Sequence, residues 1–187
     1  MKKFALAALA LLAALSTGQA LAANTTGFYI GGSLNQTTLD DSYGSISGVG
    51  LGIYGGYNFN EWFGLESNLF GSGDLGENGY DMSAVVVNIT PKFTLQLSNT
   101  VGVYAKIGLA SMAVNISGYE YGYNYDYYFE DNNTGTGITF GFGLNAAVTK
   151  HLNLRVSYDV TSGDVGYYYG DENTDIRQLA LGLHYQF

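Results

Sequence analysis

The chain has 187 residues and a formal net charge of −9, with no cysteine, one proline, 27 glycines and 17 tyrosines. Without cysteine it has no disulfide framework, no thiol chemistry and no zinc site of the cysteine type. Its acidic balance disfavours nucleic acid and polyanionic glycans as partners. No segment approaches 18 consecutive apolar residues beyond the N-terminal region, which excludes a helical membrane protein.

The N-terminus has the layout of a secretory signal peptide. Two lysines follow Met1, residues 4–15 form an apolar run, and Ala20-Leu21-Ala22 is a small-x-small cleavage site. A membrane-anchoring helix is the alternative, but the run is shorter than the roughly 20 residues that cross a bilayer. We therefore predict a cleaved signal peptide over residues 1–22 and one mature domain over residues 23–187. Cleavage leaves five basic against 16 acidic residues, a formal net charge of −11.

Eight later segments alternate between apolar residues and small or polar ones. Because successive side chains of a strand point to opposite faces, each segment predicts a strand with two chemically different faces. Strands of about ten residues match a tilted crossing of a bilayer. The fold class that this pattern predicts is all-β, an eight-stranded antiparallel up-and-down transmembrane barrel. The predicted strands cover residues 27–36, 48–59, 62–71, 83–96, 100–114, 136–148, 152–161 and 178–187.

The connections between these segments alternate in length. Short turns on one side, together with both chain ends, and long loops on the other side are typical of an outer-membrane barrel. The short connections are predicted at residues 60–61, 97–99 and 149–151. Loops of roughly ten to twenty residues are predicted at 37–47, 71–82, 115–135 and 162–175.

A soluble eight-stranded barrel of the lipocalin type is the alternative, with the apolar faces inside. It would have to turn Glu66, Lys92, Lys106, Arg155 and Asp159 toward water. The small residues of the polar face make a poor solvent-facing surface but a good crowded lumen. Aromatic residues also gather near the short-turn ends, as in a girdle at a lipid interface. These aromatic residues are Phe59, Trp62, Phe63, Phe93, Tyr185 and Phe187.

The final strand places three leucines, Tyr185 and Phe187 on one face and ends on that Phe. This ending resembles the C-terminal strand of bacterial outer-membrane barrels. The mature domain as a whole resembles the small eight-stranded group that contains OmpX, Ail, the opacity proteins and the membrane domain of OmpA. The resemblance implies a multi-pass protein of the bacterial outer membrane, surrounded by lipid and lipopolysaccharide. It also implies that Tyr185 and Phe187 form a signal for the barrel-assembly machinery, with periplasmic chaperones acting during biogenesis.

Five charged residues fall on the predicted polar faces. Glu66, Lys92, Lys106 and Arg155 lie at comparable heights above the short turns, and Asp159 lies slightly higher. Because an unpartnered buried charge costs several kcal/mol, we expect Glu66 to pair with Lys92 and Arg155 with Asp159. A gate that opens to ions is one interpretation. An eight-stranded lumen is only just wide enough for side chains, which favours a permanent polar plug in place of a hydrophobic core.

Acidic and tyrosine residues gather in the predicted long loops. The acidic residues either keep the loops soluble or attract divalent cations, although no segment has the spaced ligands of a dedicated calcium loop. Tyrosine offers a broad contact area at low entropic cost, so these residues are candidates for contact with an unidentified surface ligand. Alternatively, they line hairpins that extend beyond the membrane. The candidates are Tyr119, Tyr121, Tyr123, Tyr125, Tyr127, Tyr128, Tyr167, Tyr168 and Tyr169.

By resemblance, we expect a structural or surface-interaction role without covalent chemistry, and a narrow solute or ion channel is the alternative. Enzymes among small outer-membrane barrels place catalytic groups, usually including a histidine, near the outer rim. His151 and His184 lie instead at the short-turn end, so we predict no catalytic site, cofactor or metal. Lipid A mass spectrometry with and without the protein tests the enzyme hypothesis.

Overall fold

The structure is a computed structural model that describes residues 25–40, 45–73, 75, 80–121, 126–167 and 170–187. The predicted signal peptide over residues 1–22 lies outside these residues. No helix long and apolar enough to cross a bilayer occurs in the described part of the chain.

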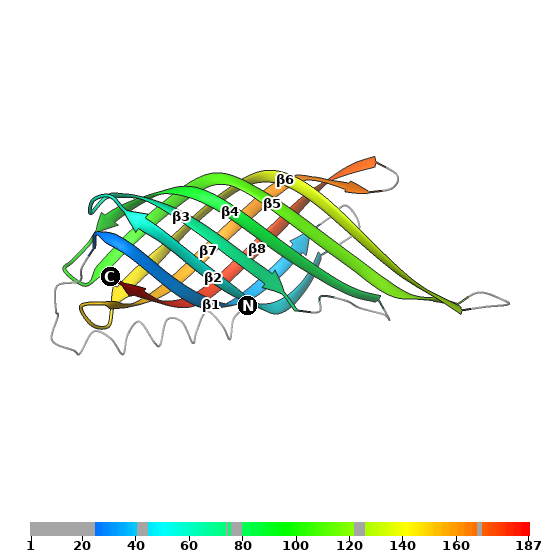
Figure 1. Cartoon of the computed structure of the whole chain (residues 1–187), viewed down its shortest axis with the longest axis horizontal. Coiled ribbons are helices and arrows are strands. Elements are labelled where there is room, and N and C mark those ends of the chain that lie inside the picture. The colour runs from blue at the N-terminus through cyan, green and yellow to red at the C-terminus, as the bar shows by residue number, and fades with distance from the viewer. Residues whose placement is uncertain (1–24, 41–44, 74, 76–79, 122–125, 168–169) are drawn as a thin grey trace.

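Eight antiparallel strands follow one another around a closed barrel (Figure 1). Each strand pairs with its neighbours in the sequence, and β1 also pairs with β8 to close the sheet. The predicted eight-stranded up-and-down barrel is therefore confirmed. The strands are β1 (Gly27–Asp40), β2 (Ser45–Asn58), β3 (Phe63–Ser72), β4 (Tyr80–Gln96), β5 (Val101–Tyr121), β6 (Asp126–Ala147), β7 (Leu152–Tyr167) and β8 (Gly170–Gln186).

Several strands run well past the ends that the sequence predicts. β5 continues to Tyr121 and β6 begins at Asp126, so most of the loop predicted over residues 115–135 is a two-stranded hairpin. This hairpin projects far beyond the rest of the barrel in Figure 1. The loops predicted over residues 37–47 and 162–175 are likewise mostly strand. The prediction of long loops there is wrong. The outward apolar residues end at the predicted strand ends, but the backbone hydrogen-bond ladder continues beyond them.

Large apolar side chains cover the outside of the barrel from the short turns up to about the level of Leu109. Leu51 and Leu109, for example, are 67% and 69% exposed. The charged residues within this part of the barrel are buried inside: Glu66, Lys92, Lys106, Arg155 and Asp159. This arrangement contradicts the soluble alternative, which requires charges outside and apolar side chains inside. A continuous apolar outer band matches contact with lipid hydrocarbon.

The two faces of the strands exchange character toward the far end of the barrel. On β4 the outward side chains change from Val87 and Val85 to Ser83, and the buried ones change from Asn88 to Val86. The same exchange occurs on β1, β2, β5, β7 and β8. Above this level the barrel is polar outside and apolar inside, as a barrel surrounded by water should be.

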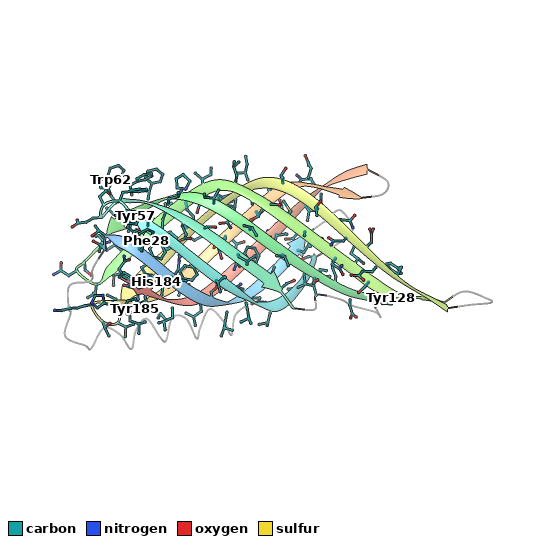
Figure 2. The ribbon with its side chains drawn as sticks, viewed as in Figure 1. Phe28, Tyr57, Trp62, Tyr128, His184 and Tyr185 are labelled. Carbon is teal, nitrogen blue, oxygen red and sulfur yellow. The ribbon has the colours of Figure 1, made fainter. Side chains whose placement is uncertain are left out.

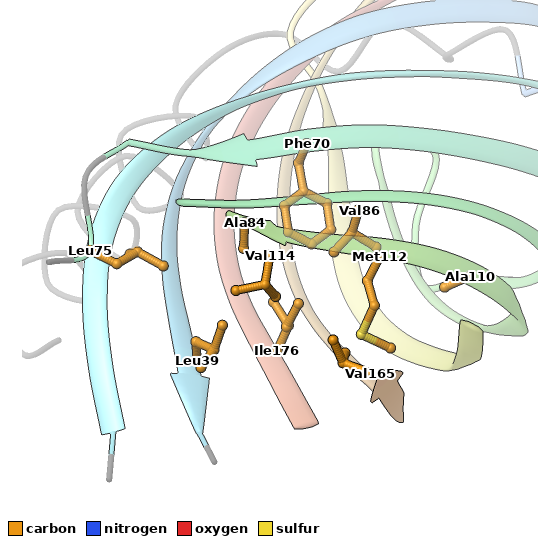
Figure 3. Packing of buried hydrophobic residues seen from close by; sticks show 10 residues of the cluster. All are labelled: Leu39, Phe70, Leu75, Ala84, Val86, Ala110, Met112, Val114, Val165 and Ile176. Carbon is orange, nitrogen blue, oxygen red and sulfur yellow. The ribbon is translucent and has the colours of Figure 1, made fainter. Parts of the chain in front are cut away.

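The apolar side chains inside this upper section form one buried cluster, which we call the apolar cap (Figure 3). The expectation that a polar plug takes the place of a hydrophobic core is wrong for this section. Toward this end of the barrel the lumen therefore contains a buried apolar cluster beyond the polar section. The cap consists of Leu39, Phe70, Leu75, Ala84, Val86, Ala110, Met112, Val114, Val165 and Ile176.

Truncation of Phe70 tests the cap. Phe70 is 1% exposed, so Phe70→Ala leaves a cavity in a packed core and should lower the free energy of unfolding by about 3–5 kcal/mol. Phe140→Ala is the matched control, because Phe140 faces outward and acyl chains can fill the space that its ring leaves. Urea unfolding of both variants in lipid vesicles measures the difference. Equal losses would contradict a packed cap.

Candidate functional site

Charged side chains from β3, β4, β5 and β7 meet in the lumen around the carboxylate of Glu66, which is 1% exposed. Arg155 donates to it twice, from Nη1 to Oε2 at 2.7 Å and from Nη2 to Oε1 at 3.1 Å. Lys106 Nζ donates to Oε1 at 3.0 Å, and the Tyr29 hydroxyl donates to Oε2 at 2.7 Å. A carboxylate has about four lone-pair sites, so these contacts fill Glu66.

The guanidinium of Arg155 lies between two tyrosine rings. Its Cζ is 4.5 Å from the ring centroid of Tyr54 and 4.4 Å from that of Tyr104. Its Nε also donates to the Tyr104 hydroxyl at 2.5 Å. A planar guanidinium combines a two-pronged carboxylate contact with stacking, which an ammonium group cannot do. Arg155 is therefore held in one orientation by Glu66 and the two rings.

The two lysines occupy different positions relative to Glu66. Lys106 Nζ lies 3.0 Å from Glu66 and 2.9 Å from Asp159 Oδ1, the latter as an ion pair outside hydrogen-bond geometry. Lys92 Nζ donates to the Tyr29 hydroxyl at 2.6 Å and lies 3.8 Å from the nearest Glu66 oxygen. We call Glu66, Lys92, Lys106, Arg155 and Asp159 the lumen cluster.

Glycines on neighbouring strands make room for this cluster. Glu66 and Tyr29 both lie opposite Gly56 in the ladders, and Lys106 and Asp159 both lie opposite Gly141. A Cβ atom at Gly56 would lie 2.6 Å from the Tyr29 hydroxyl oxygen, which is too close for real atoms. Because glycine has no side chain, these inward glycines leave space for the large side chains on the neighbouring strands. This explains part of the high glycine content.

The structure brings all five predicted lumen charges together but changes one expected pairing. Glu66 and Lys92 form an ion pair, as expected. The pair expected between Arg155 and Asp159 is wrong, because Arg155 contacts Glu66 while Asp159 contacts Lys106. Sequence reasoning also missed the tyrosines that share the cluster. Their signal was present, since Tyr29, Tyr54 and Tyr104 lie on the small-residue face of their strands.

Five of the predicted surface tyrosines belong to strands of the β5–β6 and β7–β8 pairs. Tyr128 on β6 is 53% exposed and lies opposite Tyr119 of β5 in the ladder. Tyr121, Tyr127 and Tyr167 also belong to strands. Four candidates lie outside the described residues: Tyr123, Tyr125, Tyr168 and Tyr169.

Aromatic side chains surround the short-turn end of the barrel. Figure 2 shows Phe28, Tyr57, Trp62 and Tyr185 at this end, with Tyr128 at the opposite one. The rings form a chain of contacts with centroids 4.6–6.5 Å apart. The rings of Tyr185 and Phe187 lie 5.1 Å apart, and Phe187 N donates to Phe28 O at 2.9 Å. Trp and Tyr are enriched where a membrane meets water, so this girdle marks one edge of the apolar band.

Both histidines lie at the short-turn end. His184 is buried beside Tyr54, with Nδ1 3.3 Å from its hydroxyl, and His151 stacks on Tyr185 with centroids 5.5 Å apart. Among the described residues, no group of three or more His, Cys, Asp or Glu side chains is placed to hold a metal ion.

The model of the family described as "Outer membrane protein beta-barrel domain" matches residues 7–187. The chain belongs to this family. It is thus an integral barrel of the bacterial outer membrane, in a lipid and lipopolysaccharide environment. In outer-membrane barrels, short turns typically face the periplasm and longer connections face the outside of the cell, so we expect the β5–β6 hairpin on the outer side.

Solved structures of small outer-membrane barrels share this fold. Neisserial surface protein A (NspA) is 18% identical with a TM-score of 0.71, over 87% of this chain and 98% of that one. Ail, the attachment invasion locus protein of Yersinia pestis, is 16% identical with a TM-score of 0.61, over 87% and 99%. OprG from Pseudomonas aeruginosa is 14% identical with a TM-score of 0.53, over 89% and 99%. A comparison with curated protein sequences finds no match.

Removal of the central carboxylate tests the lumen cluster. Glu66→Gln leaves Arg155 and Lys106 buried beside a neutral amide, and should lower the free energy of unfolding by about 3–5 kcal/mol. Glu61→Gln changes an exposed carboxylate in a short turn and should stay within about 0.5 kcal/mol of the parent. Urea titrations in detergent micelles compare the two. A Glu66→Gln protein as stable as the parent would show that the cluster contributes little.

Proposed function

We propose that the protein is a non-conducting, non-enzymatic outer-membrane barrel that uses its β5–β6 hairpin to contact partners at the cell surface. The observation that carries this proposal is the pairing of β6. Its ladder with β5 extends out to Asp126, whereas its ladder with β7 begins only at Gly135. Among the described strands, the β6 residues 130–134 therefore form a ladder with β5 and none with β7.

An unpaired strand edge offers backbone donors and acceptors to another chain. Partners that bind by strand addition use these groups for affinity and alternate side chains for specificity. The outward side chains along this edge include the exposed Glu130, and Asp131 beside it is exposed as well. An acidic edge favours an extended segment of a basic protein.

The charge of the outer end also bears on whether this chain binds the type of ligand seen with one structural neighbour. Ail of Yersinia pestis has been crystallised in complex with the heparin analogue sucrose octasulfate. Here the strand ends at the outer side carry Asp40, Asp81, Glu130, Asp131 and Asp164. Such an acidic end repels polyanions, so we do not extend heparin binding to this protein.

Shortening of the hairpin tests the surface role. Asn115 and Asn132 lie opposite each other in the ladder, so an Asn-Gly turn that replaces residues 116–131 can join them, removes Glu130 and Asp131, and keeps the cap residue Val114. Cells that display the shortened protein should adhere less to surfaces coated with basic proteins. Adhesion of labelled cells measures the effect, and an envelope-stress reporter shows whether the deletion acts through membrane integrity instead.

Charge reversal supplies the control for that experiment. Glu130→Lys should weaken adhesion to basic proteins, whereas Glu61→Lys, at the opposite end of the barrel, should leave it unchanged. Undiminished adhesion of the shortened protein, or equal effects of the two reversals, would contradict contact through the hairpin.

A narrow channel is the second candidate, and the packing of the lumen argues against it. The ion-paired side chains of the lumen cluster fill the periplasmic half of the lumen, and the apolar cap fills the outer half. An apolar constriction excludes water and therefore ions.

Planar-bilayer recordings test the closed lumen. The wild-type protein should show no conductance steps, and Glu66→Gln should show none either, because the apolar cap stays intact. Stable steps from the wild-type protein would support the channel. Steps from Glu66→Gln alone would show that the lumen cluster is the only seal.

The placement of both histidines supports a role without catalysis. His184 is buried within the lumen next to Tyr29 and Tyr54, and His151 lies against Tyr185 in a periplasmic turn. Neither lies near the outer rim, where lipid A is within reach.

We also propose that Tyr185 and Phe187 act as the assembly signal. Both side chains are exposed, Tyr185 on β8 and Phe187 directly after it, so a partner protein can contact them before the barrel closes. Phe187→Ala should lower the fraction of protein that reaches the outer membrane in its folded, heat-modifiable form. Phe140→Ala, which also removes an outward ring, is the control. Equal assembly of the two variants would contradict a signal at Phe187.

A further inference from the structure

We propose that the periplasmic half of the lumen binds one small inorganic anion, such as chloride, beside Lys92. The proposal is independent of the surface role, because it concerns the opposite end of the molecule. It rests on the charge balance of the lumen cluster, on the saturation of Glu66 and on a polar cavity next to Lys92.

The lumen cluster carries more positive than negative charge. Lys92, Lys106 and Arg155 face two carboxylates, Glu66 and Asp159. All five side chains are at least 95% buried, so bulk solvent screens them poorly. Three cations share two carboxylates, so one positive charge in the cluster is not neutralised, and an uncompensated buried charge is costly.

The cation left over is Lys92. Glu66 already accepts four hydrogen bonds, from Arg155, Lys106 and Tyr29, and Asp159 is engaged by Lys106. Lys92 donates to the Tyr29 hydroxyl at 2.6 Å, its Nζ lies 4.1 Å from the centroid of the Tyr29 ring, and its ion pair with Glu66 is the longest in the cluster at 3.8 Å. An ammonium group has three donors, so two of them are available to another acceptor.

A polar cavity of about 40 Å³ lies on the open side of Lys92. One water molecule needs about 10–15 Å³, so the cavity has room for a small ion together with a water. Amide and hydroxyl side chains line it, including Asn58, Thr94, Asn153 and Gln186. Such groups can donate hydrogen bonds to an anion, whereas the cavity is too small for a lipid headgroup.

The other residues around the cavity determine from which side the anion enters and which charge repels it. Glu61 and Thr100, in two of the periplasmic turns, line its mouth, so the ion arrives from the periplasm. His184 also lines the cavity. The exposed carboxylate of Glu61 repels an anion, but water screens this charge more than it screens Lys92. Lys106 and Arg155 lie behind Lys92 in the cluster and add positive potential.

Halide-dependent stability tests the site. In detergent micelles at constant ionic strength, exchange of sodium gluconate for sodium chloride should raise the Tm of the wild-type protein, because gluconate is too large for the cavity. Chloride at tenfold excess over its Kd should give a rise of about 3–6 °C. Lys92→Met should abolish this dependence, whereas Lys150→Met, which removes an exposed lysine in a periplasmic turn, should retain it. Glu61→Gln should lower the chloride concentration needed.

Bromide-soaked crystals of the wild-type protein supply a second measurement that needs no variant. An anomalous peak within about 3.5 Å of Lys92 Nζ is the expected result. The proposal is overturned if this peak is absent, if the wild-type Tm does not depend on the halide, or if Lys92→Met keeps the full dependence. A Lys92 that sheds its proton instead of binding an anion would give the first two of these outcomes.

Discussion

Hydrocarbon offers no partner to a backbone N–H or C=O group, so a sheet that crosses a membrane must have no open edge. The ladder between β1 and β8 closes this sheet. Closure leaves each strand with one face toward the surroundings and one toward the lumen. The outward face carries large apolar residues such as Leu51 and Leu109, and the charged residues are left with the interior. The lumen cluster is a consequence of this constraint, because charges that cannot face lipid must find partners inside the barrel.

The same strands continue where that constraint ends. Beyond Leu34, Val85 and Leu109 the outward residues become polar, and the inward ones become the apolar cap. The backbone geometry does not change at this level, whereas the surrounding medium does. One barrel therefore contains two kinds of core, a charged one within the membrane and an apolar one above it. The β5–β6 hairpin extends farther still and has an edge that no other described strand covers.

Much of the barrel could be predicted from the sequence, because alternation identifies strands wherever the two faces meet different media. The alternation pattern could not locate the strand ends. Between Asn115 and Gly135 alternation is weak, because a hairpin with water on both faces needs no apolar face. The same alternation identifies the lumen charges in the sequence, because they lie on the polar faces of the predicted strands. Of their pairings, only that of Glu66 with Lys92 on the neighbouring strand could be predicted, because Arg155 reaches Glu66 across the barrel and no sequence spacing encodes that distance. The sequence places Tyr54 and Tyr104 on the small-residue faces of their strands, but their contact with Arg155 depends on the register, which places Tyr54 opposite Gly31 and Tyr104 opposite Gly143.

The exchange of faces along the strands is tested most directly with spin labels on the outward side of the β5–β6 pair. The chain has no cysteine, so single cysteines can be introduced without background labelling. Labels at Leu109 and Ile138 should collide with dissolved oxygen, which concentrates in hydrocarbon. Labels at Asn115 and Thr134, on the same face but farther out, should collide with a water-soluble nickel complex. Water contact at Leu109 and Ile138, or the same lipid environment at all four positions, would contradict the account.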